Sequence, residues 1–304
     1  MKRNRFGRTG YEISMITYGG IVSTSKEFNG YTFSGDGQAE SDKSVAWALE
    51  HDVNYFDVAP SYGDAMEKLG NSLVGKRDGI VLAAKTGKRD YDGAAREFEE
   101  SLRLLHTDHF DVYQLHAVSS MDDVERAFAP DGAMKLMRDM KEQGVIRCAG
   151  ITGHNEKACL EALARYDFDT LLFPVNWLMH MGYGFAGEII KTAKARDMGL
   201  LGMKSQIERA FKDGDEAARA RFPKSWCKPF DPQTQADLLL AAMKYSYSLG
   251  VDTLIPAGNF EHFSFAVEHA DEIASIPMTE QEKKLLAEHL PQVKAYPFMH
   301  GEGF

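Results

Sequence analysis

Cysteine is scarce in this chain of 304 residues, which has only Cys148, Cys159 and Cys227. An odd number without C-x-x-C spacing excludes a disulfide scaffold or a zinc ribbon and fits free thiols in a reducing cytoplasm. Metal-ligand patterns are missing too, because there is no H-E-x-x-H motif and no suitable spacing at His154, His180 and His300. We therefore expect no metal site.

Long apolar runs are also absent, so no segment is expected to span a bilayer. The N-terminal segment MKRNRFGRTGYEIS carries cations but lacks the apolar core of a signal peptide. The formal net charge of −10 argues against nucleic acid or an anionic membrane as a partner. With 44% apolar and 26% charged residues, the composition is that of a soluble globular protein.

A dinucleotide-binding fingerprint of the form G-x-G-x-x-G is missing after the first apolar segment, which continues as YGGIVSTSKEF. A dinucleotide would therefore have to bind by another arrangement than the Rossmann fold.

Short apolar segments alternate with segments of helical period along the chain. Apolar segments of strand length cover 13–20, 53–57, 79–85, 110–116, 145–152, 169–175, 199–203 and 252–256. Helical periodicity marks 41–52, 94–105, 132–144, 155–166, 187–199 and 235–250. Three of these helices are expected to end at a glycine cap, at Gly144, Gly199 and Gly250. Repeated strand–helix units predict a parallel sheet, and eight of them favour a (β/α)8 TIM barrel in one domain over residues 1–304. A short β-hairpin around the GRTG turn precedes it.

Ionisable residues stand at or just beyond the ends of three consecutive strand candidates. Asp57, Lys85 and His116 would meet at one rim of a parallel sheet, with Tyr62 in the loop beyond. A buried lysine needs a carboxylate partner, and its ammonium would lower the pKa of a neighbouring phenol. Such a site suits carbonyl reduction, in which Tyr62 gives a proton to oxygen and His116 donates a hydrogen bond. Alone, a tyrosine before glycine is more often a turn residue, and a histidine ending a strand is more often structural.

The same residues lie within a longer series of motifs. These read FGRTGYEIS, ITYGG, NYFDVAPSYG followed by EKLG, AAKTG, SLRLLHTDHFDVYQLH, GVIRCAGITGHN and VDTLIP. In order and spacing the chain resembles the aldo-keto reductases over nearly its whole length. The resemblance implies a barrel with a nicotinamide cofactor across its C-terminal mouth. It also implies a catalytic tetrad of Asp57, Tyr62, Lys85 and His116, with Tyr62 as general acid/base.

The cofactor side departs more from the family. By the resemblance, cofactor contacts fall on Gly20, Thr152, Met203, Lys204, Ser205, Gly258, Asn259 and Glu261. Thr152 and Gly153 replace a Ser-Asn pair, Leu172 replaces a glutamine, and Ala266 replaces an asparagine. Asn259 stands where the family has a cation that binds the 2′-phosphate. Losing that charge-assisted contact would weaken NADP(H) binding by roughly 1.5–3 kcal/mol. NADP(H) is the default for the family, and this change leaves NAD(H) open.

Three irregular stretches lie at 22–38, at 205–233 and in the tail 295–304. In a barrel the first two would emerge on the C-terminal face, where sites are built, although each stretch could also be a surface excursion. Lys204 could pair with a cofactor phosphate. A basic cluster in the second stretch either replaces the missing cation or is a solvated face (Arg219, Arg221, Lys224 and Lys228). Trp177, His180 and Tyr183 could line a substrate pocket. The aromatic residues at 28–33 and in the tail could stack on a sugar or aryl ring.

The sequence thus predicts an NAD(P)(H)-dependent oxidoreductase that interconverts a carbonyl, in an aldehyde, ketone or sugar, and an alcohol. Two alternatives stay open at this stage. One is a cofactor-binding regulatory subunit, and the other is redox-neutral sugar chemistry with a retained cofactor. The oligomeric state cannot be read from the sequence.

Overall fold

Eight parallel strands form a closed barrel. The computed structural model describes residues 1–25, 30 and 36–299. The strand order is β12-β9-β8-β7-β6-β5-β4-β3, and the two outer members meet through a parallel bridge between Ile16 and Leu254. Backbone hydrogen bonds on both sides of this bridge complete the closure, since Thr17 donates to Leu254 and Leu254 donates to Met15. The predicted (β/α)8 barrel is confirmed.

The barrel strands match the apolar segments of the sequence. Their bounds are β3 Tyr18–Gly19, β4 Tyr55–Asp57, β5 Val81–Thr86, β6 Phe110–Val118, β7 Ile146–Gly153, β8 Thr170–Pro174, β9 Gly199–Met203 and β12 Thr253–Ile255. All six residues of β5 are buried, as expected where a strand has the barrel interior on one side and helices on the other. The interior is filled by side chains of alternate positions, such as Tyr55, Val81, Val112 and Leu201.

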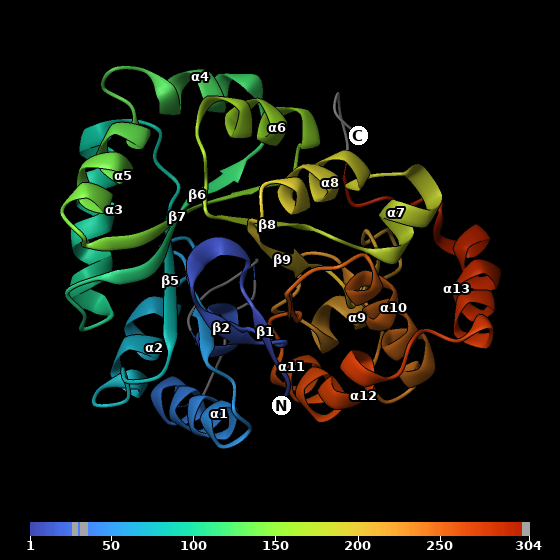
Figure 1. The fold of residues 1–304 in the computed structure, drawn as a ribbon. Coiled ribbons are helices and arrows are strands. Elements are labelled where there is room, and N and C mark those ends of the chain that lie inside the picture. The colour runs from blue at the N-terminus through green and yellow to red at the C-terminus, as the bar shows by residue number, and fades with distance from the viewer. Residues whose placement is uncertain (26–29, 31–35, 300–304) are drawn as a thin grey trace.

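Helices surround the barrel as a ring (Figure 1). Their bounds are α1 Gly37–Glu50, α2 Ala65–Leu73, α3 Tyr91–Leu104, α4 Met121–Phe128, α5 Ala133–Glu142, α6 Glu156–Arg165, α7 Trp177–Tyr183, α8 Gly187–Ala195, α9 Glu216–Arg221, α10 Ala236–Ser248, α11 Phe260–Glu268, α12 Ala270–Ser275 and α13 Glu280–Val293. Several begin at a side-chain cap, as Asp90 accepts from the Gly93 N–H at the start of α3. No helix in the described part of the chain is long and apolar enough to cross a membrane.

An antiparallel hairpin of β1 (Arg3–Arg5) and β2 (Glu12–Ser14) packs against one end of the barrel, as the sequence predicts. Its Phe6 is buried against Tyr55, with ring centres 5.4 Å apart, and against the backbone of Gly199. A Cβ on Gly199 would lie 2.5 Å from the Phe6 ring, so only glycine fits there.

This contact corrects one prediction. Gly199 begins β9 instead of capping a helix, and Asp197 takes the left-handed conformation after α8, with φ at +52°. The caps predicted at Gly144 and Gly250 are confirmed, with φ at +74° and +88°.

The second irregular stretch is partly regular. It contains a two-stranded sheet of β10 (Ile207–Arg209) and β11 (Lys228–Pro229), with α9 between them. Because β10 follows β9 closely, this unit stands at the C-terminal end of the barrel strands, where (β/α)8 enzymes build their sites.

Candidate active site

Asp57 and Lys85 form a buried ion pair at the ends of neighbouring strands. Asp57 is the last residue of β4, and Lys85 lies on β5 two residues beyond the position paired with it. The Lys85 ammonium donates to one carboxylate oxygen of Asp57 and to the Val58 carbonyl at 3.2 Å. Both side chains are almost fully buried. Burial opposes the charge, but Asp57 and the phenol of Tyr62 outweigh it and raise the pKa of Lys85. Lys85 is therefore a cation.

Gln114 holds the other oxygen of this carboxylate. It lies on β6 opposite Lys85, is fully buried, and donates from Nε2 to Asp57 Oδ1 at 2.7 Å. Room for its side chain comes from Gly150 on β7, where a Cβ would approach Gln114 Cγ to 2.8 Å. The sequence analysis missed Gln114, whose only signal was one amide inside the apolar run FDVYQLH.

Tyr62 follows β4 in the loop and lies half-buried beside Lys85, whose Nζ is 5.0 Å from the centre of the phenol ring. Burial raises the pKa of Tyr62, while the Lys85 ammonium and its hydrogen bond lower it. The effect predicted for Lys85 has the right sign, but burial is the larger effect in this structure. The phenol is thus protonated near neutral pH and has a cation beside it to stabilise its deprotonated form.

His116 faces Tyr62 from β6, with ring centres 5.9 Å apart and an edge-on arrangement. Burial first, and then the charges of Lys85, His154 and Arg89, lower the pKa of His116 to about 3. The imidazole is therefore neutral at physiological pH and can donate one N–H. A neutral imidazole can offer a hydrogen bond, but it cannot be the main proton donor near neutral pH.

An irregularity in β6 directs His116 into the site. Ala117 has φ at +54°, and the pairing of β6 with β7 shifts between Leu115 and Val118. The Ala117 N–H donates to Thr152 Oγ1 at 2.8 Å, and the Arg89 guanidinium donates to the His116 carbonyl at 2.8 Å. Thr152, expected at the cofactor, thus also fixes the backbone beside a tetrad residue.

Two adjacent cavities meet at Tyr62. The first, called here the substrate cavity, has a volume of about 340 Å³ and is lined by Tyr62, His116, His154, Lys204 and Trp226, among others. The Trp226 indole forms one wall, with its ring centre 6.0 Å from that of Tyr62. This volume suits a small molecule.

The second cavity, called here the cofactor cavity, has a volume of about 90 Å³ in this structure. It runs from Asp57 and Tyr62 past Met203 to Gly258. A strap, residues 222–228, closes it: the Lys224 ammonium donates to the Val22 carbonyl at 2.8 Å, which joins segments 202 residues apart.

Three of the eight predicted cofactor residues border this cavity, whereas Ser205, Asn259 and Glu261 line neither cavity. Met203, Lys204 and Gly258 line it, as does Leu172, and Thr152 lines the substrate cavity next to it. Gly20 does not, because it packs against Val58, where a Cβ would come within 2.6 Å; its neighbours Gly19 and Ile21 line the cavity instead.

The basic cluster is mostly neutralised. Arg221 lies 2.8 Å from Glu261 and 3.7 Å from Asp231, and Lys228 pairs with Glu208. Arg219 stacks over the Phe211 ring at 4.2 Å. One cation of the cluster, Arg221, thus reaches the residue expected near adenine, but two carboxylates already surround it.

The residues proposed from the NWLMHMGYGF segment lie elsewhere. Trp177 is fully buried and donates to the Ile207 carbonyl, His180 bonds the Tyr245 hydroxyl, and Tyr183 donates to the Lys294 carbonyl. None of the three lines the substrate or cofactor cavity, so neither cavity supports a substrate-contacting role for them. The tail does border the site, since the Phe298 ring lies 5.5 Å from Lys204 Nζ. Phe28, Tyr31, Phe33 and His300 lie outside the described residues.

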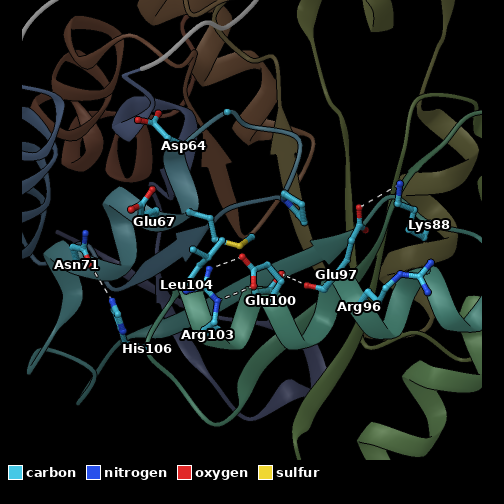
Figure 2. A pocket seen from close by; sticks show the side chains of 15 residues that line it. Asp64, Glu67, Asn71, Lys88, Arg96, Glu97, Glu100, Arg103, Leu104 and His106 are labelled. Atoms are coloured by element: carbon cyan, nitrogen blue, oxygen red, sulfur yellow. Dashed lines mark hydrogen bonds and ion pairs between the residues drawn. The ribbon is translucent and has the colours of Figure 1, made fainter.

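A larger hollow of about 900 Å³ lies between α2 and α3 on the outer side of the barrel (Figure 2). Its charged residues largely pair with each other, as in Arg103 with Glu100 and Lys88 with Glu97. No member of the tetrad lines it. We therefore place the chemistry in the smaller cavities at the strand ends.

Comparison with known proteins agrees with this architecture. A profile of the aldo/keto reductase family matches residues 28–216, well over half of the chain. The chain belongs to the aldo-keto reductase family.

The chain spans about half of the length of the curated relatives that it matches. The chain is 32% identical over 153 residues to the uncharacterized oxidoreductase YqkF of Bacillus subtilis, which covers 43% of this chain and 48% of that protein. It is 26% identical over 160 residues to L-galactose dehydrogenase of Arabidopsis thaliana, covering 48% and 47%. It is 30% identical over 145 residues to methylglyoxal reductase YeaE of Escherichia coli, covering 45% and 49%.

Among solved structures, aldo-keto reductase AKR11C1 of Bacillus halodurans superposes with a TM-score of 0.69 at 19% identity. The match covers 95% of this chain and 96% of that one. At such low identity the likeness supports the fold alone.

A nicotinamide cofactor, implied by the family, fits the polar atoms around the cofactor cavity. Within the described residues, two buried polar atoms next in sequence to residues that line this cavity have no hydrogen-bond partner: Ser205 Oγ, which follows Lys204, and Asn259 Nδ2, which follows Gly258. Buried polar atoms are normally satisfied, so these two atoms are compatible with a ligand that brings acceptor oxygens. Both were expected at the cofactor from the sequence.

Proposed function

We propose that this protein is an NAD(P)(H)-dependent oxidoreductase that interconverts a carbonyl and an alcohol, with Tyr62 as general acid/base. The observation that carries the proposal is the Lys85 ammonium, held by Asp57 and adjacent to the Tyr62 phenol at the wall of a small cavity. A buried cation is costly, and one placed beside a phenol at a cavity wall has a chemical use there.

The cofactor, when bound, supplies or accepts the hydride. In the reducing direction Tyr62 gives its proton to the carbonyl oxygen, and the Lys85 ammonium stabilises the phenolate that remains. The neutral His116 donates a hydrogen bond to the same oxygen as negative charge develops on it. In the oxidising direction, deprotonated Tyr62 accepts the alcohol proton. Trp226 and the strap limit the access of water.

We assign cofactor contacts to the rim around the cofactor cavity. Ser205 and Asn259 offer their unpaired polar atoms, Met203 and Gly258 supply walls of this cavity, and Thr152 lines the adjoining substrate cavity. NADP(H) is the family default, but Arg221 is shared between two carboxylates, so we expect only a weak preference for the 2′-phosphate. NAD(H) is therefore a second acceptable cofactor.

The substrate is expected to be a small aldehyde, ketone or sugar-like carbonyl. The volume of the substrate cavity supports this class, and two partial relatives are named for L-galactose and methylglyoxal. We also expect the protein to reside in a reducing cytoplasm, which its three buried free thiols support.

One structural observation favours the alternative of redox-neutral sugar chemistry. The Lys224 contact with Val22 closes the strap over the cofactor cavity, which favours slow exchange of a bound dinucleotide and thus redox-neutral sugar chemistry with a retained cofactor. That alternative requires cofactor to co-purify and no net consumption of nicotinamide. The regulatory-subunit alternative is disfavoured, because it does not need an intact tetrad.

The test compares wild type, Tyr62→Phe and Tyr166→Phe, the last a half-buried tyrosine that contacts Phe168 and lines neither cavity. NADPH and NADH are titrated into stripped protein by fluorescence, and turnover of small aldehydes is followed by nicotinamide absorbance. Tyr62→Phe should lose at least about 100-fold in kcat, as expected for general acid catalysis, with little change in cofactor Kd. Full activity in Tyr62→Phe would refute the acid/base role.

A further inference from the structure

Lys204 lies between the two cavities and has no carboxylate partner in the part of the chain that the structure describes. It follows the last residue of β9 and lines both the substrate cavity and the cofactor cavity. No carboxylate among the described residues pairs with it, and its ammonium lies 5.5 Å from the Phe298 ring centre. Most other lysines around this mouth have a partner: Lys85 has Asp57, Lys224 has the Val22 carbonyl, and Lys228 has Glu208.

The backbone of Lys204 is held in an unfavourable conformation. Its φ is +66°, in the left-handed region that a lysine rarely adopts. The Asn176 amide donates to the Lys204 carbonyl at 2.8 Å, and the Ile207 N–H donates to the same oxygen at 3.1 Å. Strain that neighbouring groups enforce is a frequent mark of function, and here it fixes the direction in which the side chain leaves the backbone.

His154 is the polar neighbour of this ammonium in the substrate cavity. It follows β7, lines the cavity with Tyr62 and His116, and is partly exposed to it. Burial, and next the charge of Lys204, lower the pKa of His154 to about 3. The imidazole is thus a neutral donor beside a cation. A cation and an N–H donor at one wall form a site for an anionic group.

We propose that Lys204 and His154 bind a carboxylate on the substrate whose carbonyl lies against Tyr62 and His116, so that the substrates are oxo acids and the corresponding hydroxy acids. This inference rests on the proposed function and names the substrate class of the same site. A cofactor phosphate is the competing partner for Lys204. The carboxylate is favoured because Lys204 shares the substrate cavity with His116 and His154, whereas the unpaired atoms assigned to the cofactor are the neutral groups of Ser205 and Asn259.

Paired substrates test this directly. We would measure kcat/KM for 4-oxobutanoate against butanal and for 2-carboxybenzaldehyde against benzaldehyde. A charge-assisted contact corresponds to about ten- to a hundredfold in affinity, so wild type should prefer at least one acid over its neutral partner by that factor. Lys204→Met should remove the preference, so that the ratio of kcat/KM between each acid and its neutral partner falls toward one, and Lys204→Arg should keep much of it.

Two controls accompany these variants. Lys212→Met removes an exposed lysine that stacks on Tyr296, 4.5 Å from its ring centre, and that lines neither cavity; it should leave all ratios unchanged. Binding of butanoate against butanamide to the cofactor-loaded protein, measured by calorimetry, should show the same dependence on Lys204 without turnover.

The outcomes separate the two proposals. If wild type turns over acids and neutral aldehydes equally, or if Lys204→Met weakens both alike, the carboxylate site is wrong while the oxidoreductase stands. Weaker NADPH binding in Lys204→Met with an unchanged acid preference assigns the ammonium to the cofactor instead. Absence of both cofactor binding and turnover in folded wild type overturns the proposed function, and this inference with it.

Discussion

Replacing Lys85 or Asp57, which form a buried ion pair, should lower the stability of the protein as well as its activity. Lys85 is 0% exposed and Asp57 2%, so replacing either alone leaves a charge buried without its partner. Lys85→Met leaves the Asp57 carboxylate with only the Gln114 amide, and Asp57→Asn leaves the ammonium with the Val58 carbonyl and Tyr62. Loss of one member of a buried pair costs about 3–5 kcal/mol.

The double variant decides whether this cost comes from unpaired charge. In Lys85→Met with Asp57→Asn neither charge remains, and the asparagine oxygen can still accept from Gln114. One unpaired amide group then costs about 1–3 kcal/mol, so the double variant should be no less stable than either single variant. Simple addition would instead give a loss of about 6–10 kcal/mol, twice the single value.

Urea unfolding, followed by circular dichroism and tryptophan fluorescence, gives the free energy of unfolding of wild type, the two single variants and the double variant. Folding raises the pKa of Lys85. The ion pair therefore contributes its full stability at any pH below the ordinary pKa of lysine, and this contribution is lost only as the pH rises through the raised pKa of the folded protein. The advantage of wild type over the double variant should therefore be constant from pH 6 to 9. Additive losses in the double variant, within about 0.5 kcal/mol, would refute the account of two mutually compensated charges.

Three further outcomes are expected. Glu261→Gln should free Arg221 and improve NADPH binding relative to NADH by about threefold to tenfold, and unchanged titrations would show that Arg221 does not reach the 2′-phosphate. Gln114→Leu should reduce kcat by about tenfold or more through loss of the Asp57 contact, whereas Gln114→Glu should place a second carboxylate against Asp57 and reduce it further. His262 is fully buried, and burial lowers its pKa to about 4, so the unfolded chain binds a proton at this residue first, and this group alone should cost about 1.4 kcal/mol of stability per unit as the pH falls from 6.5 to 4. His262→Gln should flatten that slope in urea midpoints measured at several pH values.

The barrel, and the proximity of Asp57, Tyr62, Lys85 and His116, could be predicted from the sequence because both follow from local pattern. Apolar runs bounded by helical segments gave all eight barrel strands, and an unpaired lysine at the end of one run required a carboxylate nearby. Gly199 shows the limit of such reasoning, since a glycine after a helix reads as a cap whether it ends the helix or makes room for a ring from the N-terminal hairpin.

The walls of the site could not be predicted, because they depend on contacts between distant segments. Nothing near Lys224 in sequence indicates that it reaches Val22, and nothing near Lys204 indicates that Asn176 holds its carbonyl in a left-handed turn. The role of Gln114 was hidden for the opposite reason. One polar residue in an apolar run is too common a feature to identify a hydrogen bond to Asp57.

Closure of the barrel between Ile16 and Leu254 sets the order in which this protein can become an enzyme during its synthesis. All four tetrad residues have left the ribosome's catalytic centre once His116 is made, but the sheet remains open until Leu254 follows, roughly 10–30 s later at usual elongation rates. During that interval β3 presents an unpaired strand edge, which is prone to association with other chains.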